Sequence, residues 1–285
     1  MLIYYIKNIF KNIIYGLFPS LVIKIKKPTG RGGTTKINSY HFDIFNSYFK
    51  HLDVEDIQEF IRDKTVVEIG PGNVLGTAFY SIVYGAKKVI CIDRFPVVFF
   101  KEQYNNFVSL IDYLPNHLKG KASEILKNYD DLKNRIVYYS DLTGRFTHIP
   151  DIKADIILSN AVLEHVYDLP SLFNMLSKIS DKNALMFHGV DLRSHTMHYK
   201  NELDFLNVPI ILWKLMTCFR GAPNRITRSE YINIFESHNF KILRELIVKK
   251  YDTATVKEYI LYNKKNTVDI KDLEIAIIGF VCKVC

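Results

Sequence analysis

Short runs of apolar residues recur along most of this chain, and stretches with helical spacing of their apolar positions separate several of them. Seven runs have the length and composition of strands: Lys64–Ile69, Lys88–Ile92, Arg135–Tyr139, Ala154–Ser159, Ala184–Val190, Lys241–Val248 and Glu274–Val284. Five stretches are typical of helices: Thr77–Tyr84, Phe95–Asn106, Ala122–Tyr129, Leu169–Ile179 and Ser229–His238. Their alternation predicts an α/β fold with a doubly wound, mostly parallel, seven-stranded sheet covered by helices on both faces.

The first 23 residues form an amphipathic pattern of their own. Polar side chains share one predicted helix face (Lys7, Asn8, Lys11, Asn12), and apolar ones share the other (Ile3, Ile6, Phe10, Ile13, Ile14, Leu17). Lysines, a glycine and a proline interrupt the segment too often for a membrane-spanning helix, and no signal-peptide cleavage site follows. Two interpretations stay open: a helix on an anionic membrane surface, or one packed on the domain or a second subunit, which is more typical of such stripes.

The stretches before the first strand also have helical spacing, over Asn38–Leu52 and Val54–Arg62. We therefore predict a helical N-terminal extension over residues 1–52 and one domain over residues 53–285. Aromatic side chains of the first stretch could cover a ligand, although most are expected to pack. Residues 95–134 and 193–226 are longer than ordinary α/β connections require, and are predicted to form a substrate cap beyond the carboxyl ends of the strands.

The composition indicates where the protein is located and what it could bind, but not which reaction it catalyses. The 285 residues are 48% hydrophobic and 24% charged, which is ordinary for a globular protein, and the net charge is +8. That charge suggests an anionic partner or serves solubility alone. The four cysteines lack the paired spacing of a zinc site. We expect a reducing, cytoplasmic location, with peripheral contact at the inner face of the membrane if the first 27 residues bind lipid.

A glycine-punctuated turn follows the first strand and is the strongest chemical signal. The sequence Glu68-Ile-Gly70-Pro71-Gly72 ends the strand, and Gly76 precedes the next helix. A strand, a tight turn and a helix N-terminus together can hold a nucleotide-like ligand against backbone N–H groups. The G-x-G-x-x-x-G spacing is one residue longer than the dinucleotide fingerprint, and no lysine follows for a triphosphate.

Polar residues also end the next strands along the sheet. Asp93 ends the second strand, where a carboxylate can accept both hydroxyls of a ribose; Asp141 follows the third, and Asn160 follows the fourth. With the glycine turn, this ordered set resembles the class I S-adenosylmethionine-dependent methyltransferases, most closely over residues 60–190. The resemblance implies a Rossmann-like methyltransferase fold and S-adenosyl-L-methionine as cofactor.

By the same resemblance, the glycines and Asn160 line the methionine part of the cofactor, Asp93 its ribose and Asp141 its adenine. The full set of implied cofactor residues is Glu68, Gly70, Pro71, Gly72, Gly76, Asp93, Arg94, Asp141, Leu142, Asn160, Ala161 and Glu164.

Titratable side chains gather just after the fourth and fifth strands. We predict His165 as the first candidate for a general base, followed by Asp191, His195 and His188. A neutral imidazole suits a hydroxyl acceptor near pH 7. Two other interpretations stay open: each histidine is a structural hydrogen bonder, or Glu164 and its neighbours bind a divalent metal. Of these interpretations, we favour a site that contains no metal.

The sequence indicates the methyl acceptor less directly than it indicates the cofactor. The run from His188 onward resembles methyltransferases of surface-glycan and natural-product pathways, which implies O-methylation of a sugar, a nucleotide-sugar or a glycan-linked group. Alternatives are a lipid or quinone-like acceptor at the membrane, or a module that binds the cofactor without catalysis. Nucleic acid is not expected as a partner, because Asn160 is not followed by the Pro-Pro-aromatic box that grips a flipped base. Arg225 and Arg228 could bind an anionic group or pair with nearby carboxylates. The oligomeric state stays open.

Overall fold

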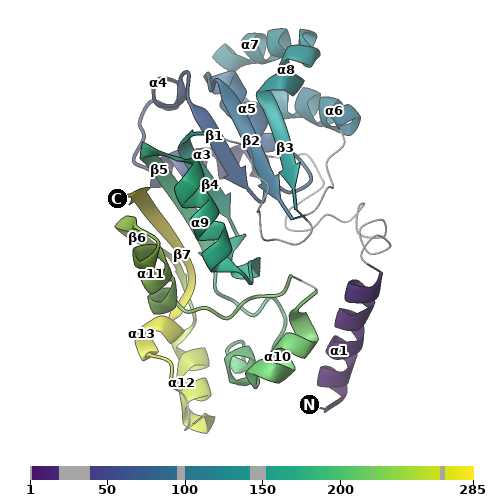
Figure 1. The fold of residues 1–285 in the computed structure, drawn as a ribbon, viewed down its shortest axis with the longest axis vertical. Helices are drawn as coiled ribbons and strands as arrows, with labels where there is room; N and C mark the ends of the chain where they lie inside the picture. The colour runs from purple at the N-terminus through teal and green to yellow at the C-terminus, as the bar shows by residue number, and fades with distance from the viewer. Residues whose placement is uncertain (1, 19–38, 95–99, 142–151, 220, 264–266) are drawn as a thin grey trace.

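A computed structural model describes residues 2–18, 39–94, 100–141, 152–219, 221–263 and 267–285. Its centre is one seven-stranded sheet with the order β3-β2-β1-β4-β5-β7-β6 (Figure 1). The β5–β7 and β7–β6 pairs are antiparallel and the other pairs are parallel. The strands are β1 (Thr65–Ile69), β2 (Lys88–Asp93), β3 (Ile136–Ser140), β4 (Ala154–Asn160), β5 (Ser180–Asp191), β6 (Phe240–Lys250) and β7 (Ile275–Val284). The predicted fold class and all seven strands are confirmed.

Helices cover both faces of the sheet, so the central strands are apolar on both sides. In β1, Val66 packs toward one face and Val67 toward the other, as the twofold repeat of a strand requires. The first face is covered by α3 (Tyr40–His51), α4 (Ile57–Ile61), α5 (Gly76–Tyr84), α6 (Phe100–Leu110), α7 (Asn116–Lys127) and α8 (Tyr129–Arg135). The second is covered by α9 (Leu169–Ile179) and α11 (Arg228–Ser237). The first five strands therefore end at one common edge, where ligands of open parallel sheets bind.

The helix predictions were correct in kind, with errors at the ends and three omissions, the first of which is α10 (Ile210–Thr217), between β5 and α11. The helix predicted over Ala122–Tyr129 is two helices, α7 and α8. The predicted start of another at Phe95 lies outside the described residues, and α6 is described from Phe100. The sequence pattern did not reveal α12 (Thr253–Tyr262) or α13 (Ile270–Leu273), which stand between β6 and β7. Val256 and Tyr259 of α12 are buried whereas Leu261 and Tyr262 are exposed, so its apolar residues form no single stripe.

Two of the predicted domain boundaries need correction. Residues 40–51 are not part of an extension, because α3 buries Phe45 and Phe49 completely in the main core. In residues 100–134, the described part of the first predicted cap segment, Phe107, Leu118 and Leu132 lie in the same core. The side chain of Gln103 on α6 supports the glycine turn: its amide donates to the carbonyl of Asn73 and accepts from the N–H of Leu75.

The N-terminal helix α1 (Leu2–Leu17) lies along α10 (Ile210–Thr217), away from the sheet (Figure 1). Tyr4, Tyr5 and Ile9 pack against a small separate core that includes Trp213. In the part of the chain that the structure describes, no helix is long and apolar enough to cross a membrane.

The placement of α3 in the core gives a stability prediction. Replacing Phe45 by Ala removes a fully buried ring that packs against Tyr80 and Tyr84. We expect the free energy of unfolding to fall by about 3–5 kcal/mol, as for other buried phenylalanines. Phe10→Ala is the matched control, because that ring is 65% exposed on α1. Urea denaturation measures both variants. Equal losses of unfolding free energy would indicate that residues 40–51 form an extension outside the core.

Candidate functional site

The glycine turn forms one wall of a pocket at the carboxyl end of β1. Gly70 and Gly72 have φ angles of +69° and +72°, which side-chain-bearing residues rarely adopt. A Cβ atom on Gly70 would lie 2.3 Å from Cγ2 of Val162. Other residues around the pocket come from α3, β1, the turn itself, α5 and β4: Tyr40, His41, Ile44, Tyr48, Glu68, Pro71, Asn73, Val74, Thr77 and Asn160.

The structure brings together much of the predicted cofactor set. Glu68, Gly70, Pro71, Gly72 and Asn160 line this pocket. Gly76 begins α5 beside the pocket, where a Cβ atom would lie 2.9 Å from the Cβ of His41. Three members of the set lie elsewhere on the edge: Asp93 at the end of β2, Arg94 after it, and Asp141, whose N–H donates to the carbonyl of Asp93. Leu142 lies outside the described residues.

The α3 side of the pocket was only partly anticipated from the sequence. Tyr40, His41 and Tyr48 line the pocket, whereas Phe45 and Phe49 of the same helix pack in the core. The helical spacing of these aromatic residues was the available signal, because it puts His41, Phe45, Tyr48 and Phe49 along one buried side of α3, where the pocket adjoins the core.

Glu68 is a buried carboxyl group within the pocket. It is 4% exposed, and burial raises its pKa to about 7 despite a hydrogen bond from the Thr77 hydroxyl. The nearby charge of Asp93 adds to the rise. One oxygen, Oε2, has no hydrogen-bond partner. A cationic or N–H-bearing ligand would satisfy that oxygen and stabilise the carboxylate.

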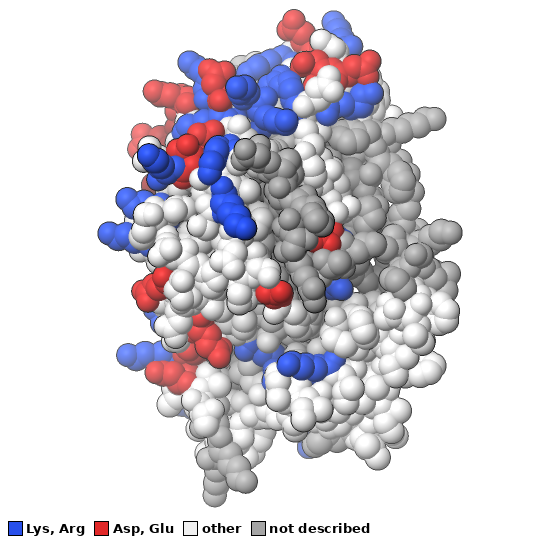
Figure 2. Space-filling view, in the orientation of Figure 1, with Lys and Arg blue, Asp and Glu red and all other residues white. Residues whose placement is uncertain are grey.

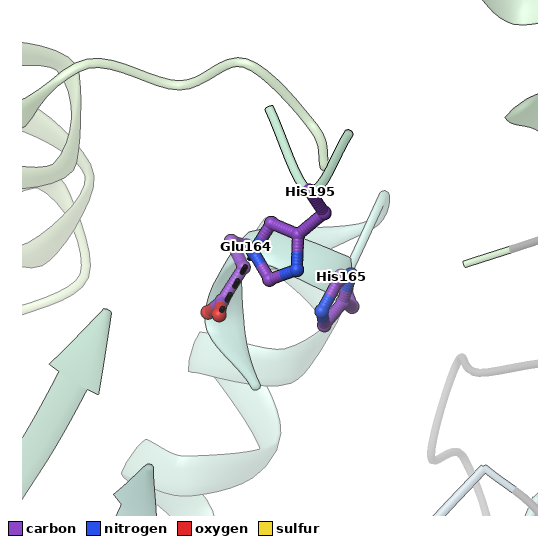
Figure 3. A group of neighbouring side chains, drawn as sticks. All are labelled: Glu164, His165 and His195. Carbon is purple, nitrogen blue, oxygen red and sulfur yellow. Dashed lines mark ion pairs between the residues drawn. The ribbon is translucent and has the colours of Figure 1, made fainter. Parts of the chain in front are cut away.

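A second group of polar side chains lies beyond β4 and β5. Glu164 and His165 belong to the short 3-10 turn Leu163–His165 after β4, and Asp191 ends β5. Nε2 of His195 lies 3.7 Å from Asp191 Oδ2 and 4.0 Å from Glu164 Oε1. Figure 3 shows His195 reaching over this turn toward Glu164 and His165. We name Glu164, His165, Asp191 and His195 the acceptor-side cluster.

The four members differ in burial and protonation. Glu164 is 1% exposed, and burial raises its pKa to about 8, helped by the charge of Asp191. The amides of Glu164 and Asp191 lie near its oxygens, but neither oxygen has a well-formed hydrogen bond. Burial also raises the pKa of Asp191, yet the hydrogen bonds and charge of Arg193 outweigh it and keep that pKa below its ordinary value.

The two histidines are in contact but have different surroundings. Their rings lie edge to face with centroids 4.9 Å apart. Burial lowers the pKa of His165 to about 4, with a contribution from His195, so His165 is neutral at pH 7. Its Nδ1 is buried without a hydrogen-bond partner. His195 is about one-third exposed and has a φ angle of +49°, an unusual backbone conformation for a side-chain-bearing residue. Such strain is often found at functional sites.

The structure places His188 elsewhere. Its ring is completely buried and its Nδ1 shares a hydrogen bond of 2.8 Å with the Ser159 hydroxyl. Phe173 and Phe235 pack beside it, so burial lowers its pKa to about 3. The assignment of His188 as a catalytic candidate is corrected: because β5 alternates its side chains between two faces, this histidine points into the core.

Three groups in the cluster also have a geometry suited to a metal ion. One ligand atom each from Glu164, His165 and His195 lies within 4.8 Å of the others (Figure 3). Two imidazoles and a carboxylate are common ligands of divalent first-row metals. The metal alternative therefore stays open, and it uses His165 and His195, which are also candidates for the general base.

Ala161 and the two late arginines have structural roles. The N–H of Ala161 donates to the carbonyl of Gly189, which joins the ends of β4 and β5. Arg225 donates to the carbonyls of Phe205, Leu206 and Val208. Arg228 forms an ion pair with Glu245 at 2.6 Å. These contacts favour the pairing interpretation of the arginines over an anion site.

Comparison with known proteins identifies the family. Residues 56–245 match the model of a family described as a methyltransferase domain, which is more than half of the chain. No curated protein sequence matches the chain.

Many solved structures resemble it, and three of them illustrate the low sequence identity. A protein from Galdieria sulphuraria, provisionally assigned as a sarcosine dimethylglycine methyltransferase, is 12% identical, with 85% of each chain covered and a TM-score of 0.49. An S-adenosylmethionine-dependent methyltransferase from Mesorhizobium loti is 13% identical, with 78% of this chain and 92% of that chain covered and a TM-score of 0.46. A ribosomal protein L11 methylase from Lactobacillus delbrueckii is also 13% identical, with coverages of 80% and 74% and a TM-score of 0.38.

The glycine turn gives a binding prediction. Gly70→Ala forces a methyl group against Val162 in a disfavoured backbone conformation, and we expect the affinity for S-adenosyl-L-methionine to fall about tenfold or more. Gly120→Ala is the matched control, because a Cβ atom there would meet nothing within 4 Å. Titration calorimetry measures both, and unchanged affinity in Gly70→Ala would place the ligand away from this turn.

The buried carboxyl of Glu164 gives a prediction about pH. Its pKa is raised in the folded protein, so the folded state holds a proton that the unfolded state has lost between about pH 4.5 and 8. The free energy of unfolding therefore falls as the pH rises through this range. Glu164→Gln should remove up to about 1.4 kcal/mol per pH unit of that slope. Urea denaturation of both proteins between pH 5 and 8 tests this prediction, and Glu68 contributes equally to the two. Identical slopes of unfolding free energy against pH would mean that Glu164 is ionised over this whole range.

Proposed function

This chain belongs to the S-adenosylmethionine-dependent methyltransferases, and on that premise we propose that it methylates a hydroxyl group of a sugar, a nucleotide-sugar or a glycan-linked compound. The cofactor supplies an electrophilic methyl group on a cationic sulfonium. Glu68, Gly70, Gly72 and Asn160 would hold its methionine side, and Asp93 and Asp141 its nucleoside side. The Gly70–Val162 contact and the unpartnered oxygen of Glu68 support this placement.

The observation that carries the proposal is the exposed imidazole of His195 in front of two carboxyl groups. Nε2 of the ring faces Asp191 and Glu164, which leaves the other ring nitrogen to accept the proton of an acceptor hydroxyl. The Asp191 carboxylate would stabilise the imidazolium that forms, as in other histidine–carboxylate pairs. His195 therefore replaces His165 as our first candidate for the general base.

His165 is better suited to positioning than to proton transfer. Its ring is mostly buried and packs edge to face against His195. With a pKa near 4 it is a weak base at neutral pH, so its contribution is to hold the His195 ring in place. Asp191 is fixed in turn by two hydrogen bonds from Arg193, at 2.8 and 2.6 Å.

A hydroxyl-rich acceptor fits the character of this cluster. Two imidazoles, two carboxyl groups and the guanidinium of Arg193 offer donors and acceptors within a small volume. Such groups can orient an acceptor that has several hydroxyls, and orientation supplies much of the rate when the protein forms no covalent bond. The alternative of a lipid or quinone-like acceptor at the membrane depends on the N-terminal helix α1 rather than on this cluster.

Paired substitutions test the assignment. We expect Asp93→Ala to abolish binding of S-adenosyl-L-methionine because it removes the proposed ribose contact. His195→Ala should leave that binding intact and slow turnover by about 10²- to 10⁴-fold. Calorimetry measures binding, and release of S-adenosylhomocysteine with a panel of saccharides and nucleotide-sugars measures turnover. His117→Ala, an exposed histidine on α7, is the control.

The same assay separates the base from the metal alternative. Turnover that survives chelation and is lost in His195→Ala supports the general base. Turnover that disappears on chelation and returns with a divalent cation assigns Glu164, His165 and His195 to a metal instead. Undiminished turnover in His195→Ala, with or without chelation, would contradict the proposed role of this residue.

A further inference from the structure

The amphipathic helix α1 is attached to the protein by the side that carries Asn8 and Asn12, and Tyr4, Tyr5 and Ile9 pack beside them. The side chain of Asn12 donates to the carbonyl of Leu215 and accepts from the N–H of Phe219, both at 2.9 Å. Asn12 is 2% exposed and Asn8 is 9% exposed. Gly16 lies so close to the Phe219 ring that a Cβ atom would be 2.6 Å from it. The orientation of α1 is thus fixed by specific contacts.

The consequence is that the apolar stripe of α1 faces outward. Ile3 is 83% exposed and Phe10 is 65% exposed, and the same is true of their neighbours along the stripe. Exposed apolar side chains continue onto α10, where Ile211 is 73% exposed. We name this surface the α1–α10 face: Leu2, Ile3, Ile6, Phe10, Ile13, Leu17, Ile210, Ile211, Leu215 and Phe219. A globular monomer rarely leaves so many large apolar side chains exposed on two neighbouring helices, as the described residues do here.

The charged residues of α1 and α10 have one sign. Lys7 and Lys11 on α1 and Lys214 on α10 are exposed, and neither helix contains an acidic residue. In Figure 2 the surface over α1, at the lower right, shows no red. Apolar side chains beside lysines are typical of helices that lie in the interface of an anionic membrane.

We propose that the α1–α10 face docks on an anionic phospholipid surface. A second copy of the chain fits this face less well. A symmetric pairing would bring the lysines of two copies together, and neither helix offers a carboxylate to neutralise them. Phospholipid headgroups supply that negative charge, and the acyl region takes up the isoleucine, leucine and phenylalanine side chains.

The face is connected directly to the acceptor-side cluster. The chain leaves α10 and reaches Asn224, whose N–H donates to the carbonyl of Glu164 at 2.6 Å. The Asn224 side chain donates to the carbonyls of Leu163 and Val166, on either side of Glu164 and His165. One segment of the chain therefore joins the proposed docking surface to the proposed acceptor site.

Vesicle flotation with the full chain tests the docking. We expect binding to vesicles of phosphatidylglycerol and phosphatidylcholine, and little binding to phosphatidylcholine alone. Phe10→Asp and Ile211→Asp should each weaken binding about tenfold or more, because each puts a charge where an apolar side chain entered the lipid. Leu261→Asp is the matched control, since this side chain is 75% exposed on α12, outside the α1–α10 face. Lys7→Glu with Lys11→Glu should weaken binding to the anionic vesicles selectively.

Each outcome decides the proposal. Absence of binding to anionic vesicles would overturn it, and so would equal losses in Ile211→Asp and Leu261→Asp. A concentration-dependent dimer that the same two aspartate variants disrupt, without vesicle binding, would assign the face to a second copy. Flotation needs neither cofactor nor acceptor, so its failure leaves the proposed O-methylation standing. Conversely, vesicle binding with unchanged turnover in His195→Ala would retain the docking and reject the proposed base.

Discussion

The close contact between Gly70 and Val162 joins the two halves of the site. Gly70 belongs to the turn after β1, and Val162 belongs to the turn after β4, which pairs with β1 in the sheet. A Cβ atom on Gly70 would lie 2.3 Å from the valine, so the two turns can meet only where the first has no side chain. Asn160, two residues before Val162, lines the pocket, and Glu164, two residues after it, enters the acceptor-side cluster. One short segment thus connects ligand binding with the proposed acceptor chemistry.

Buried carboxyl groups on both sides of that contact give the site its electrostatic character. Glu68 and Glu164 both have pKa values raised by burial, and one oxygen of Glu68 and both oxygens of Glu164 have no hydrogen-bond partner. Such groups destabilise the protein when ionised alone, and a cation or a hydrogen-bond donor offsets that penalty. The Glu68 side suits a sulfonium nucleoside. On the Glu164 side, Nε2 of His195, the residue proposed to take up a proton, lies 4.0 Å from Oε1.

The sheet and much of the pocket were predictable because they depend on local pattern. Strand β1 is an apolar run that ends in glycines, and these glycines are needed for the positive φ angles that the turn adopts. The proximity of Glu164 to His195 was also accessible, since residues after adjacent strands meet at one edge. The exposure of each histidine could not be predicted from the sequence. His188, His165 and His195 differ in surroundings because helices α9 and α11 cover one and leave another partly open, which depends on packing between distant segments.

The orientation of α1 shows most clearly where sequence pattern stops being sufficient. The helical period correctly assigns Asn8 and Asn12 to one face and Ile3 and Phe10 to the other. It does not say which face meets the protein, and the usual rule that the apolar face does so is wrong here. Asn12 instead meets a free carbonyl and a free N–H at the end of α10, two groups that a buried isoleucine would leave without hydrogen bonds. The backbone at the end of α10 therefore selects the polar face, and the apolar stripe is left to bind a partner outside the chain.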